Sequence, residues 1–193
     1  MAEQVRTKYS VSRIIPVDIE DIIEIRLELG VIPWPNLRNA HDIYGFLSND
    51  RTSIYVDSGM FMDPKFEAAL RFTMAHELGH FFLHKEFYEE HPITDANDWK
   101  ALLAHIDGAN LVAYEDQADE FAGRLLVPLQ DLKSELTSMA PFLAEVKRTN
   151  EFQFDSDNYQ QLLLNVAADR LAPTFIVPFE VMVMRMKREG IVL

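Results

Sequence analysis

One stretch of the chain, His76-Glu77-Leu78-Gly79-His80, constrains the fold more than any other part of the sequence. Its two histidines are four residues apart, and on an α-helix this spacing places both side chains on nearly the same face. Glu77 then lies about 100° around the helix from His76, beside a shared metal ion rather than bound to it. The pattern is typical of metalloprotease-type sites, where two histidines bind zinc and the glutamate is the general base. The sequence therefore predicts a helix that carries His76 and His80 as metal ligands and Glu77 as a catalytic base.

Composition limits what else can hold such a metal. The 193 residues are enough for one domain with a sizeable core, and they include no cysteine, so any zinc must be held by histidines and carboxylates. The net charge of −13 argues against binding to nucleic acids, which depends on neutralising phosphates. We see no hydrophobic signal segment and no apolar run of about 20 residues, so we expect a cytoplasmic protein with no membrane partner.

The first part of the chain is expected to contribute a polar arm and one helix. Residues 1–15 have the composition of an exposed arm. Residues 18–29 have apolar side chains at helical spacing, and Asp18 is placed to cap that helix. The proline-rich stretch 32–35 must be extended or turning, because proline disfavours a helical conformation in the residue before it.

A small, mostly antiparallel sheet is expected next. Residues 43–47 and 53–56 have the pattern of two strands, and the polar turn 48–51 joins them into a hairpin. Residues 60–62 are a candidate third strand. The strand 53–56 could pair through its edge with an extended substrate, or that edge could be covered.

The helix that carries the metal-binding pattern begins at Asp63-Pro64, since aspartate is a good N-cap and proline suits the first helical position. It should run to about His84. Gly79 inside it costs about 1 kcal/mol relative to alanine. Either it lets a neighbouring backbone approach the metal site closely, or it is simply tolerated. Residues 85–113 are expected to be an irregular acidic connection with a short helix near 98–105.

The remainder of the chain is predicted to be helical, within a single domain that spans residues 1–193. The predicted helices are 115–127, ended by Pro128; 157–171, broken by Pro173; and 178–190, which begins at Pro178. Together with shorter helical pieces they form a helical C-terminal subregion from about residue 141.

A third metal ligand is needed, because catalytic zinc usually takes three protein ligands. His84 lies one turn beyond His80, but three ligands in a line along one helix cannot surround a tetrahedral ion, so we expect His84 at the helix end. Glu115 lies on a different helix with Asp119 one turn further on the same face. Glu115 can bind the metal while Asp119 accepts a hydrogen bond from the distal nitrogen of a ligating histidine. The alternative is an acidic face exposed to solvent.

Two segments resemble the signatures of one known family. Residues 72–84, FTMAHELGHFFLH, resemble the active-site helix of the ImmA/IrrE-type metallopeptidases. Residues 115–128 resemble the second signature of that family, which is close to E-x-Q-A-N-x-F-A-x-x-L-L-M-P. Asp119 stands where the family commonly has asparagine, and Val127 where it commonly has methionine. Residues 168–192 also resemble the terminal pair of helices in the family.

The resemblance implies a compact zincin-like α+β domain and a zinc-dependent endopeptidase. Its relatives often cut helix-turn-helix repressors in phage, mobile-element or stress-response circuits, so the expected partner is a transcriptional repressor or antitoxin-like regulator. Glu77 would accept a proton from the attacking water and pass it to the leaving amine. The oxyanion stabiliser is open, with Tyr114 and Arg185 as candidates. The residues expected to hold the single zinc ion are His76, His80 and Glu115.

Two other functions stay open. The protein could be a metal-containing binding module that holds a regulatory partner without cutting it, although a structural site has no need of a base such as Glu77. It could also be a DNA-binding regulator, because residues 167–188 have the order helix, tight turn, helix and end in basic residues. The apolar stretch 181–184 and the acidity of the chain oppose DNA binding.

Overall fold

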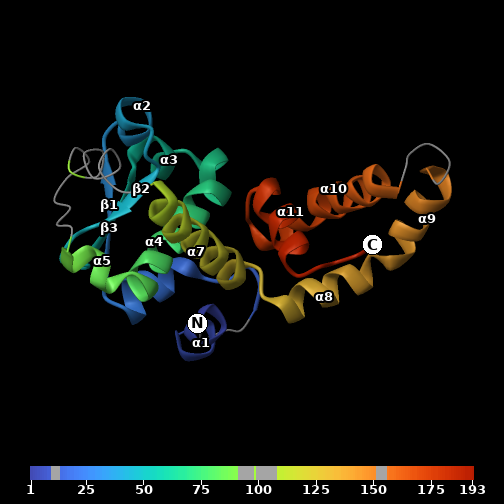
Figure 1. Ribbon diagram of the computed structural model, residues 1–193, viewed down its shortest axis with the longest axis horizontal. Helices are drawn as coiled ribbons and strands as arrows, with labels where there is room; N and C mark the ends of the chain where they lie inside the picture. Colours follow the sequence, from blue (N-terminus) through green and yellow to red (C-terminus); the bar gives the residue numbers. More distant parts are fainter. Residues whose placement is uncertain (10–13, 91–97, 99–107, 151–155) are drawn as a thin grey trace.

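The computed structural model describes residues 1–9, 14–90, 98, 108–150 and 156–193, which form two lobes (Figure 1). The first lobe holds a sheet and the helices up to α7 (Gly108–Leu126). The second lobe is helical and starts at Leu129, before the expected position near residue 141. It contains α8 (Leu129–Ser138), α9 (Ala140–Asn150), α10 (Ser156–Phe175) and α11 (Phe179–Arg188). A largely helical chain with one small sheet confirms the predicted α+β class.

The N-terminal segment is a helix and not the polar arm that we predicted. Helix α1 (Ala2–Tyr9) packs against α7 and buries Ala2 and Val5. Burial of these two side chains against a helix that follows a hundred residues later stabilises α1. Its own sequence, which is mainly polar, gives no such indication.

The next helical segment follows the prediction more closely. Asp18 caps it as expected, since its Oδ1 accepts a hydrogen bond from the backbone N–H of Asp21 at 2.9 Å. The segment continues as a π-helix, η1 (Asp21–Arg26), which packs against the first strand of the sheet. Ile22 and Ile23 of this turn are fully buried, so the apolar spacing in the sequence does mark the buried face.

The sheet has three strands among the described residues, in the order β1–β3–β2. The strands β2 (Gly45–Leu47) and β3 (Ser53–Asp57) form the predicted antiparallel hairpin. The segment expected to be extended or turning is a strand, β1 (Gly30–Trp34), parallel to β3, which makes the sheet mixed. Pro33 is compatible with this strand because β1 lies at an edge. Strand β3 is paired on both sides, so of the two alternatives left open for residues 53–56, the structure has the covered edge and not the free one.

Asp57 explains why the expected third strand of the hairpin region is a helix. Its Oδ1 accepts the N–H of Met60 at 3.1 Å and so caps α3 (Ser58–Met62). Its Oδ2 accepts the N–H of Arg38, in α2 (Leu37–His41), at 3.0 Å. One buried carboxylate at the end of β3 thus starts α3 directly and holds α2 beside it.

Helix α4 (Glu67–Leu83) carries the metal-binding pattern, and it contacts β2, β3 and α7 (Figure 1). The 3-10 turn η2 (Pro64–Phe66) precedes it, and Asp63 caps this turn by accepting the N–H of Lys65 at 3.1 Å. The predicted start and end of this helix are therefore confirmed to within a few residues.

The connection after α4 is more regular than expected. Helix α5 (Lys85–Glu90) follows directly, and α7 starts at Gly108, about two turns before the expected residue 115. The short helix expected near 98–105 lies outside the described residues, apart from residue 98.

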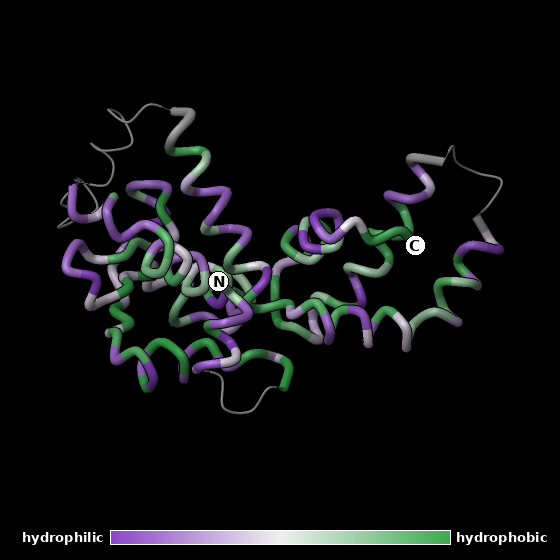
Figure 2. Tube along the Cα trace, turned by 60° about the horizontal axis from the view of Figure 1, so that its bottom comes forward, coloured by the Kyte–Doolittle hydropathy of each residue, from purple (hydrophilic) through white to green (hydrophobic). Residues whose placement is uncertain are grey.

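In the second lobe, hydrophobic and hydrophilic residues alternate along the helices, as expected for helices with one packed face (Figure 2). Helix α10 continues two residues beyond Pro173, where we expected a break. The N–H groups of Ile176 and Val177 bond to the carbonyls of Pro173 and Ala172 at 3.2 and 3.1 Å, which closes the last turn. Across the described parts of the chain, no single helix is long and apolar enough to cross a membrane; α10 and α11 meet that test only together, with a bend of 113°.

Arginine side chains join α11 to α7. Arg185 is 2% exposed, and its Nε donates to the backbone carbonyl of Val127, at the end of α7, at 3.0 Å. Its guanidinium also pairs with Glu189, which in turn lies 3.0 Å from Nη2 of Arg124 on α7. These contacts satisfy a carbonyl at the C-terminus of α7 and attach the second lobe to it.

Candidate metal site

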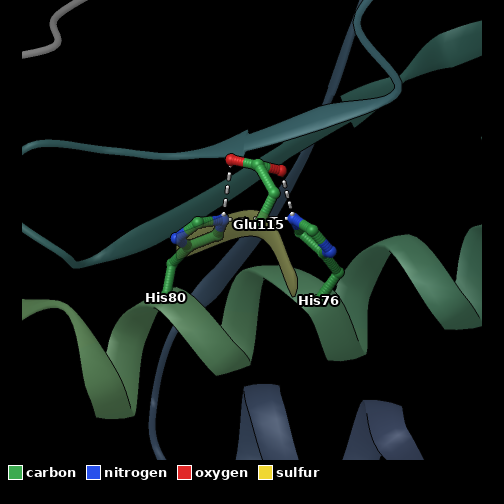
Figure 3. Close-up of side chains that lie close together, drawn as sticks. All are labelled: His76, His80 and Glu115. Carbon is green, nitrogen blue, oxygen red and sulfur yellow. Dashed lines mark hydrogen bonds and ion pairs between the residues drawn. The ribbon is translucent and has the colours of Figure 1, made fainter. Parts of the chain in front are cut away.

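His76 and His80 lie one turn apart on α4, with their Nε2 atoms 3.1 Å from each other. Glu115, on α7, faces both rings (Figure 3). Its Oε2 lies 3.1 Å from Nε2 of His76, and its Oε1 lies 3.5 Å from Nε2 of His80. The potential ligand atoms of the three residues all lie within 4.8 Å of one another. The structure thus brings together the residues expected as ligands, close enough to bind one metal ion.

The spacing and chemistry of these atoms fit a zinc ion. Bonds of about 2.0–2.1 Å in a tetrahedral arrangement place two ligand atoms roughly 3.3 Å apart, close to the observed distances. Oε1 of Glu115 is buried and has no hydrogen-bond partner among the described residues. A buried carboxylate oxygen without a partner is costly, and a bound cation would remove that cost. Two imidazoles and one carboxylate are also a donor set used by catalytic zinc sites.

Asp119 orients the first of the two histidines. Its Oδ1 lies 2.8 Å from Nδ1 of His76, so the carboxylate accepts the Nδ1 proton and leaves Nε2 facing Glu115. Burial by itself lowers the pKa of His76, but the hydrogen bonds to Asp119 and Glu115 outweigh burial and raise this pKa to about 10. At neutral pH a metal ion must therefore displace a proton from His76 in order to bind.

Glu77 is 5% exposed and lines the same cleft as the three candidate ligands. Burial raises the pKa of Glu77 to about 7, and the charge of Glu115 contributes to this rise. The charge of His76 and the backbone N–H of Leu47, in strand β2, both act in the opposite direction and lower this pKa. A carboxylate with a pKa near neutrality can both accept and return a proton, which is what a general base in hydrolysis must do.

Two residues behind His80 were not predicted to take part in the site. Nδ1 of His84 lies 2.9 Å from Nδ1 of His80, and Nε2 of His84 lies 3.2 Å from Oε1 of Gln117. Burial lowers the pKa of His84, and lowers that of His80 well below its usual value, so both rings are neutral at pH 7. The third histidine at a four-residue spacing was a signal for His84. For Gln117 the signal was only the glutamine of the second family signature, because its contact with His84 depends on how α7 crosses α4.

Gly79 allows a neighbouring backbone to approach α4 closely, which is the first of the two alternatives that the sequence left open. A Cβ atom added at Gly79 would lie 2.8 Å from Cα of Ala118 and 3.1 Å from its carbonyl oxygen. The missing side chain therefore allows the backbone of α7 to pass against α4. Glu115 lies one turn before Ala118, so this contact determines how far the carboxylate stands from the two histidines.

The candidate ligands open into a cleft of about 660 Å³ between the sheet, α4 and α7. Tyr44 and Gly45 bring the outer edge of β2 to its wall, and His41 at the end of α2 lies beside them. Phe72 of α4 and Pro178, just before α11, also line it. The mixture of apolar walls and a few polar groups is usual for a site that binds an organic substrate.

Neither candidate for the oxyanion stabiliser lies in this cleft. Within the described parts of the chain, its lining includes neither Tyr114 nor Arg185. The ring of Tyr114 packs edge-on against His84, with ring centres 4.8 Å apart. Arg185 instead contacts the carbonyl of Val127 and the carboxylate of Glu189, at the end of α7. We therefore do not propose either residue for that role.

A family model described as the IrrE N-terminal-like domain matches residues 66–187, which is more than half of the chain. The chain belongs to this family. The family is one of peptidases, and the match confirms the resemblance seen in the sequence. The IrrE N-terminal-like region includes α4 and α7, with all the candidate ligands, and continues through most of α11. No curated protein matches the chain.

Proposed function

We propose that this IrrE N-terminal-like protein is a zinc-dependent endopeptidase. One observation carries the proposal: two imidazole nitrogens and a carboxylate converge beside a second, buried carboxylate in an open cleft. A purely structural metal site would have no use for Glu77, whereas hydrolysis needs a base beside the metal. The substrate that we propose is a regulatory protein, with helix-turn-helix repressors and antitoxin-like regulators as the first candidates.

In the proposed mechanism, His76, His80 and Glu115 hold the zinc ion. Zinc, when bound, supplies a Lewis acid that acidifies a water molecule and polarises the scissile carbonyl group. Glu77 takes the proton from the water on its carboxylate and later gives it to the leaving amine. Asp119 keeps the ring of His76 in the orientation that presents Nε2.

We propose that the substrate chain lies in an extended form along β2. The carbonyl of Tyr44 accepts the N–H of Asp57 in β3 at 2.9 Å. Because neighbouring residues of an antiparallel strand bond to opposite sides, the next residue, Gly45, directs its backbone groups away from β3. Gly45 also lines the cleft, so these groups are available to pair with a peptide by β-augmentation. The strand edge proposed here is therefore that of β2, and not that of residues 53–56, which was one of two alternatives in the sequence.

The test compares wild type with Glu77→Gln, using the purified product of the neighbouring gene as the candidate substrate and mass spectrometry to detect cut products. We expect the variant to keep its zinc and to cleave at least about 100-fold more slowly, because a general base contributes factors of this size. Full activity in Glu77→Gln would show that the base is wrongly assigned. A partner that binds wild type but stays intact would instead support a binding module.

The ligands need a separate test by elemental analysis. His80→Ala and Glu115→Ala should each lose most of the bound zinc, because each removes one of three protein ligands. Zinc content equal to that of wild type in both variants would refute the ligand set whatever the cleavage assay shows.

A further inference from the structure

Behind the metal site, a chain of hydrogen bonds leads from His80 through His84 to Gln117. The two Nδ1 atoms of the histidines are 2.9 Å apart, and Nε2 of His84 is 3.2 Å from the side-chain oxygen of Gln117. Both histidines are only 3% exposed, so water cannot easily replace these bonds. The three residues join the last turn of α4, the residue that caps its C-terminus and α7.

The positions of the protons in this series of hydrogen bonds follow from the requirement that His80 bind the metal. Only one proton can lie between the two Nδ1 atoms, so one ring donates and the other accepts. If His80 is to bind zinc through Nε2, that nitrogen must be free of hydrogen, and the proton of the neutral ring must be on Nδ1. His84 then accepts at Nδ1 and carries its own proton on Nε2. That proton points at the oxygen of Gln117, which can accept it.

The opposite arrangement is also possible in this geometry and would block the metal. If His84 donated from Nδ1, His80 would accept there and would carry its proton on Nε2, where the metal must bind. The free Nε2 of His84 would then need a donor, which Gln117 can provide only if its amide turns over and presents its NH₂ group. In the structure it is the amide oxygen of Gln117 that lies 3.2 Å from Nε2 of His84. This orientation corresponds to the first arrangement, in which His80 can bind zinc.

Given the zinc site of the proposed function, we propose that His84 and Gln117 are positioning residues that hold His80 in the tautomer able to bind the metal. His84 does not touch the metal itself. It accepts the proton from Nδ1 of His80, and Gln117 accepts the proton from Nε2 of His84. Asp119 accepts the Nδ1 proton of His76 in the same way. Each ligand histidine therefore has its own hydrogen-bond acceptor on the side away from the metal.

The decisive experiment measures zinc affinity by competition with a chelator and needs no substrate. Asparagine places its side-chain oxygen where histidine has Nδ1, and leucine has the same shape without an acceptor. We expect His84→Asn to bind zinc within about threefold of wild type, and His84→Leu to bind it 10- to 100-fold more weakly, the usual effect of losing such a partner. Gln117→Met should weaken binding in the same direction but less, because it acts one bond further away.

A packing role for His84 predicts the reverse order, since leucine suits a buried position better than asparagine. Equal zinc affinity in the two His84 variants, or weaker binding by His84→Asn, would overturn the proposal. Tyr114→Phe is the matched control, because it keeps the ring that packs on His84 and should leave zinc affinity unchanged. Thermal unfolding of each variant identifies any that does not fold.

Nitrogen NMR of histidine-labelled, zinc-loaded wild type gives a second readout. We expect His80 to carry its proton on Nδ1 and His84 to carry its proton on Nε2. A proton on Nδ1 of His84 would refute the assignment. Failure of the peptidase proposal would be recognised separately, as intact substrate with normal zinc binding. If wild type bound no zinc, the zinc site and this proposal would both be wrong.

Discussion

The contact between Gly79 and Ala118 allows a sharp test of how the metal site is built. In Gly79→Ala, the new Cβ would start 2.8 Å from Cα of Ala118, whereas ordinary contacts begin at 3.4 Å. The difference between these two distances means that one helix must move by about 0.6 Å. Since Glu115 lies on the helix that is pushed away, it moves relative to His76 and His80.

The expected magnitudes differ for folding and for metal binding. Alanine gains about 1 kcal/mol over glycine in helix propensity, while overpacking of this kind costs about 1–3 kcal/mol. The free energy of unfolding should therefore fall by no more than about 2 kcal/mol. Metal–ligand distances tolerate deviations of only about 0.2 Å, so a shift of the carboxylate three times as large should weaken zinc binding about tenfold or more.

The assay combines chelator competition for zinc with thermal unfolding of the same proteins. Gly123→Ala is the matched control, also a glycine within a helix. There the new Cβ would meet only Cδ of Arg185 at 3.7 Å, an ordinary contact. It should keep full zinc affinity and gain up to about 1 kcal/mol in stability. If Gly79→Ala behaved like Gly123→Ala in both measurements, our reasoning about the close approach would be refuted.

Three further predictions concern other parts of the molecule. A hydrogen bond from Arg185 lowers the pKa of Glu189 below its usual 4.5, so wild type should be more stable than Glu189→Gln by about 1 kcal/mol at pH 7. This advantage, present above pH 4.5, should be lost in denaturation experiments as the pH falls through the lowered pKa of Glu189. In Gly45→Ala, the new Cβ would lie 2.8 Å from the carbonyl oxygen of Tyr55, and urea denaturation should show a loss of about 1–3 kcal/mol. Asp119→Asn keeps an acceptor but loses the charge, so zinc affinity in a chelator assay should fall by less than about tenfold; a larger fall would mean that the charge matters most.

Local spacing predicted much of the site. The regular geometry of a helix decides that His76 and His80 share a face, and that Glu115 and Asp119 do so on another helix. The sequence also indicated the capping residues Asp18 and Asp63, because capping involves only near neighbours in the chain. The crossing of α4 and α7 brings these local patterns together. Its only sign in the sequence was Gly79, which could also have been a glycine that is merely tolerated in a helix.

Features that depend on distant contacts were harder to predict. The parallel pairing of β1 with β3 was not predicted, because Pro33 left an extended segment and a turn equally open, although a proline is acceptable in an edge strand. Helix α1 was missed because it is stabilised by packing against α7, which buries Val5, and not by its own sequence. The role we propose for His84 likewise depends on Gln117, which is distant in sequence and is brought near by helix packing.

The bond from Arg185 to the carbonyl of Val127 has a practical consequence for work with this protein. Helix α7 supplies Glu115 in its first half and is capped at its other end by the last helix of the chain. A shortened protein that stops after α7 would contain every candidate ligand and still lose the support of that helix. Attempts to obtain a minimal catalytic fragment should therefore retain α11, or should connect it directly to the end of α7.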